Sequence, residues 1–176
     1  ICSNQELIWG GIYQKSDGVR HAILYKTDSN GNALWCKNYF PAQLSAIRAI
    51  DINTDGTIAV CGYKSPSLKS TIEPMNFDDP KWYKCFLLLM KVDTLGDTVW
   101  TRTFSPAYSN LGRSIKICND RSLIILADLQ NSESSEFDAY LLKTYENGSL
   151  AGLQHKETIF DFVLFPNPSS GRLIIL

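Results

Sequence analysis

The sequence lacks the patterns by which catalytic and metal-binding proteins are commonly identified. Its two histidines, His21 and His155, lie outside any Ser-His, Cys-His or zinc-binding spacing, and there is no GxSxG, phosphate loop or dinucleotide fingerprint. The five cysteines form neither a CxxC pair nor a Cys/His cluster. We therefore expect solvated or turn histidines and small, buried cysteines, with a disulfide between two of them left open. No catalytic residue, cofactor or metal ion is expected within the chain.

Neither a strong net charge nor a long apolar run is present. Lysine and arginine number 17 against 18 aspartate and glutamate, so the formal charge of -1 provides no field to attract nucleic acid. The longest apolar runs, such as residues 86–90 and 123–127, are far shorter than the roughly 20 residues of a transmembrane helix. These runs suit buried strands, and 44% apolar with 20% charged residues is typical of a globular fold.

The main positive feature is an internal repeat. Residues 35–62 align without a gap with residues 100–127 at an offset of 65, and residues 1–11 fit the same frame at an offset of 51. A third copy, around Gly148, has Gly152 where the other two copies have tryptophan. The positions that coincide between the two better copies are Asp28 with Asp93, Gly31 with Gly96, and Trp35 with Trp100.

Each repeat unit consists of four short apolar segments separated by turn residues, which predicts antiparallel sheets. In the middle unit the expected strands are residues 46–52, 57–63, 85–92 and 98–104. The second and third are apolar on both faces, as strands between two neighbouring sheets must be. The fourth alternates and carries Arg102, and Lys37 occupies this position in the earlier copy. A charged residue there is typical of an edge strand.

Four-stranded units with a tryptophan near the last strand resemble the blades of a β-propeller. The pattern Lys-x-Asp-x-x-Gly-x-x-x-Trp is similar to blade repeats of secreted bacterial proteins. The resemblance implies an all-β, partial β-propeller of about three four-stranded antiparallel blades, incomplete at the N-terminus, with further blades upstream. Its units are a partial blade (1–40), a full blade (41–104) and a degenerate blade (105–158). A three-sheet prism or a curved open stack stays open as an alternative.

The middle unit carries an insertion, at about residues 65–82, whose prolines and acidic side chains are typical of a loop. Long loops on rigid scaffolds commonly carry recognition. We therefore place the candidate binding residues in this insertion and directly after it, at Asn76, Asp78, Asp79, Trp82 and Tyr83.

The repeated Asp, Gly and Trp positions have structural and functional interpretations. Residues 28–32 have the alternating oxygen side chains of a calcium loop, but hairpin turns in which Gly31, Gly96 and Gly148 take positive φ explain the same residues. We expect Trp35 and Trp100 to pack between blades. The pattern also resembles the tryptophan docking motif of quinoprotein propellers, although it has one residue fewer, so a quinone-linked dehydrogenase is a weaker alternative.

The C-terminal segment has an aromatic residue, a Pro-Asn-Pro run and a Ser/Gly turn ahead of an apolar stretch. These residues are Phe165, Pro166, Asn167, Pro168 and Gly171. They resemble the opening of the type A C-terminal sorting domain of the type IX secretion system, which implies that residues 159–176 are a truncated sorting segment. A proline-rich turn that joins two β units is the alternative.

Together the repeat and the sorting resemblance imply an exported bacterial protein, extracellular or at the cell surface. We expect a non-catalytic interaction or scaffold module that binds a protein or glycan and uses the type IX export machinery. The alternative is an accessory part of a secreted hydrolase whose catalytic residues lie outside this chain.

Overall fold

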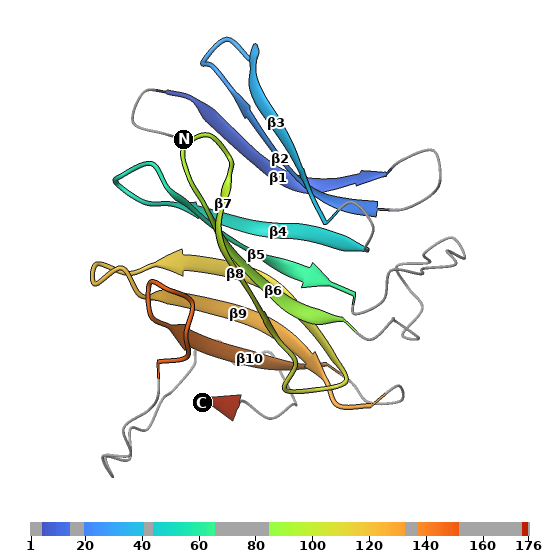
Figure 1. Ribbon diagram of the computed structural model, residues 1–176. Coiled ribbons are helices and arrows are strands. Elements are labelled where there is room, and N and C mark those ends of the chain that lie inside the picture. Colours follow the sequence, from blue (N-terminus) through green and yellow to red (C-terminus); the bar gives the residue numbers. More distant parts are fainter. Residues whose placement is uncertain are drawn as a thin grey trace.

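The computed structural model describes residues 5–14, 20–40, 44–65, 85–132 and 137–151, together with the backbone of residues 174–175. All regular elements of this part are β-strands, which confirms the all-β prediction, and they form three separate sheets (Figure 1). The described residues contain no helix with the length and apolar character needed to cross a membrane.

The three sheets follow one another along the chain, and within each sheet consecutive strands pair. Sheet A contains β1 (Leu7–Gln14), β2 (Arg20–Thr27) and β3 (Ala33–Tyr39). Sheet B contains β4 (Ser45–Ile52), β5 (Ile58–Lys64), β6 (Phe86–Val92) and β7 (Thr98–Phe104). Sheet C contains β8 (Ser109–Ile117), β9 (Leu123–Gln130), β10 (Phe137–Thr144) and β11 (Ile174–Ile175).

The first ten strands pair antiparallel, whereas the two-residue β11 runs parallel to β10. It takes the edge position next to β10, which β7 takes next to β6 in sheet B. The third copy of the repeat, which lacks the tryptophan, therefore has a different last strand from the other two.

The strands predicted for the middle unit are confirmed, each to within one residue at either end. As expected, β5 and β6 are buried on both faces and β7 is the half-exposed edge of sheet B. Alternation and run length thus predicted both the strands and their order within the sheet.

Sheets B and C share an irregularity at equivalent arginines. Between β4 and β5 the register shifts at Arg48, and between β8 and β9 it shifts at Arg113. Each arginine is an extra residue in its strand, which is a β-bulge and increases the local twist. The sequence repeat is therefore also a repeat of backbone geometry.

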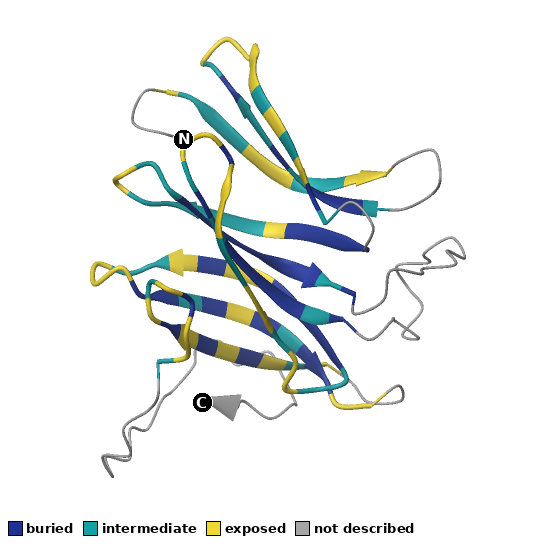
Figure 2. Cartoon of the chain, in the orientation of Figure 1, coloured by how far each residue is buried: buried dark blue, intermediate teal, exposed yellow. Residues whose placement is uncertain are grey.

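Sheet B lies between the other two sheets, and both of its faces are covered (Figures 1 and 2). Leu24 and Met90 belong to the apolar cluster between sheets A and B, while Leu89 and Ile125 belong to the cluster between sheets B and C. All four side chains are fully buried. Burial of this kind stabilises the fold by about 25 cal/mol per Å² of apolar surface, so the clusters between the sheets hold the stack together.

Two expectations about single residues are wrong. His21 is completely buried in β2 and is not a solvated or turn residue. Cys36 is exposed on the edge strand β3 and Cys118 is only half-buried, whereas Cys61 and Cys85 are buried as predicted. Burial raises the pKa of both buried thiols to about 12. Residue type alone does not report whether a strand face is covered, and this decides the exposure of His21 and Cys36.

Candidate functional site

Five hairpin turns of the chain have the same geometry. In the turn of sheet B that begins at Asp93, the N–H of Asp93 donates to the carbonyl of Asp97 and the N–H of Gly96 donates to the carbonyl of Asp93. The same two bonds close the turns that begin at Asp28, Asn53, Cys118 and Tyr145. Their fourth residues all have positive φ, namely Gly31, Gly56, Gly96, Arg121 and Gly148.

Asp28 completes its own turn with its side chain. Its carboxylate accepts bonds from the N–H groups of Asn30 and Asn32, and from Nδ2 of Asn32, each at 2.8 Å. The side-chain bond from Asn32 is the largest of the effects that lower the pKa of Asp28. No cluster of three or more His, Cys, Asp or Glu suited to a metal ion occurs in the described part of the chain. The carboxylate of Asp28 is thus engaged by its own hairpin turn.

Trp35 joins sheet A to the β6–β7 turn of sheet B. Its Nε1 donates to the carbonyl of Thr94 at 3.2 Å, and its ring lies so close to Gly96 that an added Cβ would be 3.0 Å from it. Tyr39 donates to the carbonyl of Gly96 at 2.6 Å. Lys37 forms an ion pair with Asp97 at 2.8 Å. We call the ring-on-glycine arrangement the tryptophan–glycine contact.

The tryptophan–glycine contact recurs between sheets B and C. An added Cβ on Gly148 would be 2.8 Å from the ring of Trp100 and 2.9 Å from the side chain of Arg102. Arg102 stands in the position of Lys37, and its guanidinium lies 5.8 Å from the centre of the Trp100 ring. Each contact thus uses a tryptophan and a cation from one sheet and a glycine from the next.

An open cleft of about 260 Å³ lies where β4 and β8 end, between sheets B and C. Asp51 connects the two sheets there, because its carboxylate accepts the N–H of Ile117 at 2.8 Å and pairs with Nζ of Lys116 at 2.9 Å. Burial raises the pKa of Asp51, but the bonds from Ile117 and Lys116 outweigh it and leave the pKa below the ordinary 3.8. Asp51 is therefore held as a carboxylate.

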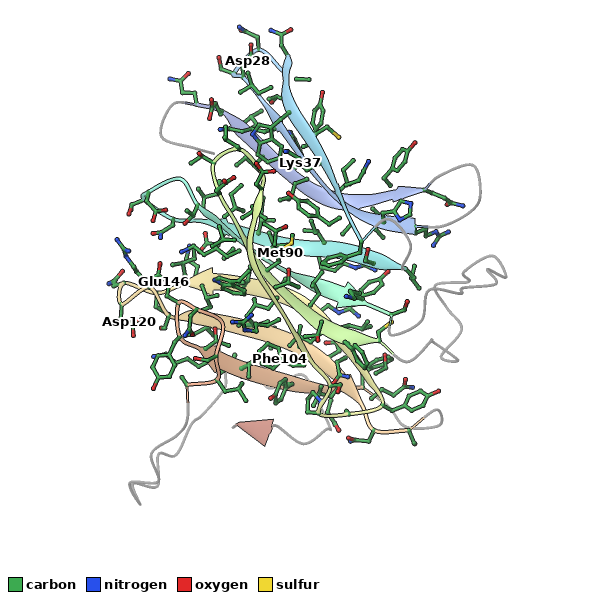
Figure 3. All side chains as sticks on the ribbon, viewed as in Figure 1. Asp28, Lys37, Met90, Phe104, Asp120 and Glu146 are labelled. Atoms are coloured by element: carbon green, nitrogen blue, oxygen red, sulfur yellow. The ribbon has the colours of Figure 1, made fainter. Side chains whose placement is uncertain are left out.

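Arg121 borders the same cleft and has an unusual backbone. Its φ is 63°, whereas the four equivalent turns have glycine at this position. A strained backbone of this kind costs of order 1–3 kcal/mol. Its guanidinium lies 3.8 Å from Glu146, which also accepts a bond from Lys91 at 2.7 Å. Figure 3 shows Glu146 and Asp120 at this end of sheet C. The cations that line the cleft thus have carboxylate partners.

The insertion between β5 and β6 is anchored at both ends. At its start, the N–H of Ser65 donates to the carbonyl of Leu44 at 2.8 Å. At its end, the buried Asn110 donates to the carbonyl of Cys85 from both its backbone N–H and its Nδ2, each at 3.0 Å. Asn110 also exchanges side-chain bonds with the backbone of Ala107. Neither anchor is recognisable from local sequence, because each joins residues far apart in the chain.

The sequence-predicted site residues have different outcomes. The repeat positions come together in pairs, with Trp35 on Gly96 and Trp100 on Gly148, while Asp28 and Gly31 lie in the β2–β3 turn of sheet A. The predicted binding residues and the sorting residues lie outside the described part of the chain, and are Asn76, Asp78, Asp79, Trp82, Tyr83, Phe165, Pro166, Asn167, Pro168 and Gly171.

Sequence reasoning missed Asp51, Asn110 and Arg121. For Arg121 a signal existed, since the repeat aligns it with Gly56 and so places a side chain at a glycine position.

A scan against models of protein families finds no match to this chain, and a search of curated proteins finds no significant match. Any inference about function therefore depends on the residues of this chain.

Proposed function

We propose that the three sheets are blades of a β-propeller that acts as a non-catalytic interaction or scaffold module of an exported bacterial protein. Two repeated features support this interpretation. The arginine bulge recurs within sheets B and C, and the tryptophan–glycine contact recurs between consecutive sheets. Sheets that follow one another in chain order and repeat the same contact form a regular stack, as propeller blades do. Such a stack is a rigid support for loops.

We propose that the insertion between β5 and β6 is the binding loop, because both of its ends are anchored. Asn110 is fully buried, and its bonds to Cys85 and Ala107 fix the point where the insertion returns to β6. The bond from Ser65 to Leu44 fixes the opposite end. Loops with fixed ends on a rigid support lose less entropy when they bind, which favours recognition. We propose Asn76, Asp78, Asp79, Trp82 and Tyr83 as the contact residues for a protein or glycan.

Binding of the chain to arrays of glycans and extracellular proteins tests this role. We expect hits whose affinity falls in Trp82→Ala and in the double variant Asp78→Asn/Asp79→Asn. Leu95→Ala is the matched control, because Leu95 is 64% exposed and lies at the opposite end of β6. Hits that survive both loop variants would contradict the binding role of the insertion. Hydrolysis of an array polysaccharide by this chain would contradict the non-catalytic role and favour the hydrolase alternative.

We further propose that the segment around Phe165 and Gly171 directs export through the type IX system. The support is the motif itself, with an aromatic residue followed by Pro-Asn-Pro and a Ser/Gly turn. Replacing both Pro166 and Pro168 by alanine in a bacterium that has this system should retain the protein inside the outer membrane. Fractionation of cells and medium measures this, and undiminished export of the double variant would contradict it.

A further inference from the structure

The outer face of sheet A, which points away from sheet B, carries large apolar side chains that are exposed, although His21 on the same face is buried beside Tyr13. Side chains alternate along β1, and Ile8 packs on the A/B cluster while Trp9 and Tyr13 point the other way. Trp9 is 58% exposed and Tyr13 is 45% exposed. Soluble proteins rarely leave several large apolar side chains together on one strand face, so such a face indicates an interaction surface.

The repeat identifies what covers this position elsewhere in the chain. Trp9 aligns with Val60 of sheet B and Ile125 of sheet C, and both of these side chains are 0% exposed. Val60 is covered by sheet A and Ile125 by sheet B. In both sheet B and sheet C, the preceding sheet covers this face. The outer face of sheet A is therefore equivalent to a surface that forms a sheet–sheet interface twice elsewhere in the chain.

The β2–β3 turn of sheet A is also uncovered, although its equivalents in sheets B and C are covered. Gly31 aligns with Gly96 and Gly148 and shares their positive φ. Those two glycines are covered by Trp35 and Trp100, whereas no described atom lies within 4 Å of a Cβ built on Gly31. Gly31 therefore has the conformation and the open surface that a tryptophan–glycine contact requires.

The geometry points to one occupant of this face, which is a further four-stranded sheet of the same repeat. We propose that its edge strand carries Trp-x-Lys or Trp-x-Arg and that its tryptophan covers Gly31. A second copy of this chain does not supply the tryptophan, because Trp35 and Trp100 are already engaged and the third unit has Gly152 at that position. The inference depends on sheet geometry alone and not on the proposed binding function.

The internal interfaces also indicate what the docking sheet must present. The strand that faces the next sheet carries Gly10 in sheet A and Cys61 at the equivalent position in sheet B. Small side chains at this position allow close approach. We therefore expect a glycine, alanine or cysteine at this position of the docking sheet.

An extended chain tests the proposal. A second copy of residues 44–116 is placed before Ile1, so that Ile1 follows Lys116 as Ile117 does in the repeat frame. The added residues supply a four-stranded sheet with its own copies of Trp100 and Arg102. NMR should then show an upfield ring-current shift of the Gly31 α-protons and NOEs between Gly31 and the added tryptophan. Oxidation of Trp9 by hydroxyl radicals should be lost.

The control is Trp100→Ala in the added copy only. It should abolish the Gly31 shift while Gly148 keeps its contact with the original Trp100. An extended chain in which Gly96 and Gly148 show their shifts but Gly31 does not would overturn the proposal.

The unextended chain provides an independent test that does not require the added sheet to fold. Hydroxyl radicals should oxidise Trp9 rapidly in the folded, unextended chain, because Trp9 is 58% exposed. Protection of Trp9 from oxidation in a folded monomer would overturn the proposal. So would sedimentation that shows a dimer of the unextended chain in which Trp9 is protected from oxidation, since the occupant would then be a second copy.

Discussion

Replacing Gly112 by alanine should push sheets B and C apart. A Cβ at this position in β8 would lie 2.8 Å from Cδ1 of Leu87 and 2.9 Å from the backbone N and O of Gly62 in β5. Two of these three atoms are backbone and do not move without their strand. Overpacking of this kind costs about 1–3 kcal/mol. For a chain of this size we expect Tm to fall by about 2–12 °C.

The matched control is Gly11→Ala. Gly11 is also a strand glycine, but no described atom lies within 4 Å of a Cβ built there. Its replacement should be neutral or stabilise by about 0.5 kcal/mol, because alanine reduces the entropy of the unfolded chain. Urea unfolding followed by circular dichroism compares the two variants. If Gly112→Ala is as stable as Gly11→Ala, the two sheets do not approach each other as described.

Three further predictions concern buried contacts. Asn110→Ala should lower the free energy of unfolding by about 1–3 kcal/mol, since the N–H and carbonyl of Ala107 lose their side-chain partner and the carbonyl of Cys85 keeps only the backbone N–H of residue 110; an unchanged urea midpoint would contradict this. The free energy of unfolding of the wild type should decrease as the pH is lowered below 3.8, the ordinary pKa of Asp, because Asp51 stabilises the fold only while its carboxylate is ionised. Acid unfolding curves of Asp51→Asn should show a smaller decrease, and curves parallel to those of the wild type would refute the stabilising role of Asp51. Iodoacetamide at pH 8 should label the exposed Cys36 rapidly and the buried Cys61 only on unfolding, and equal rates by mass spectrometry would refute the burial.

Much of the fold is predictable from the sequence because it depends on local patterns. Period-two alternation and turn residues located the four strands of sheet B, and glycine at the fourth turn position predicted the positive φ of Gly31, Gly96 and Gly148. These features are decided within a few residues of chain. Self-alignment extended the prediction to the order of the sheets.

The remaining features depend on contacts between distant segments. The predicted exposure of His21 and Cys36 is wrong because burial depends on which segment covers a strand face. Asn110 anchors Cys85 across 25 positions of sequence, and Asp51 binds Lys116 across 65. No local pattern encodes these pairs. Arg121 differs, because its alignment with Gly56 could have indicated the positive φ of its backbone.

The central claim is that consecutive sheets stack through the same tryptophan–glycine contact. An NOE spectrum of the assigned 176-residue chain tests it most directly. The claim predicts cross-peaks from the Trp35 ring to the Gly96 α-protons and from the Trp100 ring to the Gly148 α-protons. Gly31, in an equivalent turn, should show no cross-peak to either ring. Absence of both cross-peaks in the folded chain, or contact of either tryptophan with its own hairpin instead, would contradict the stacked arrangement.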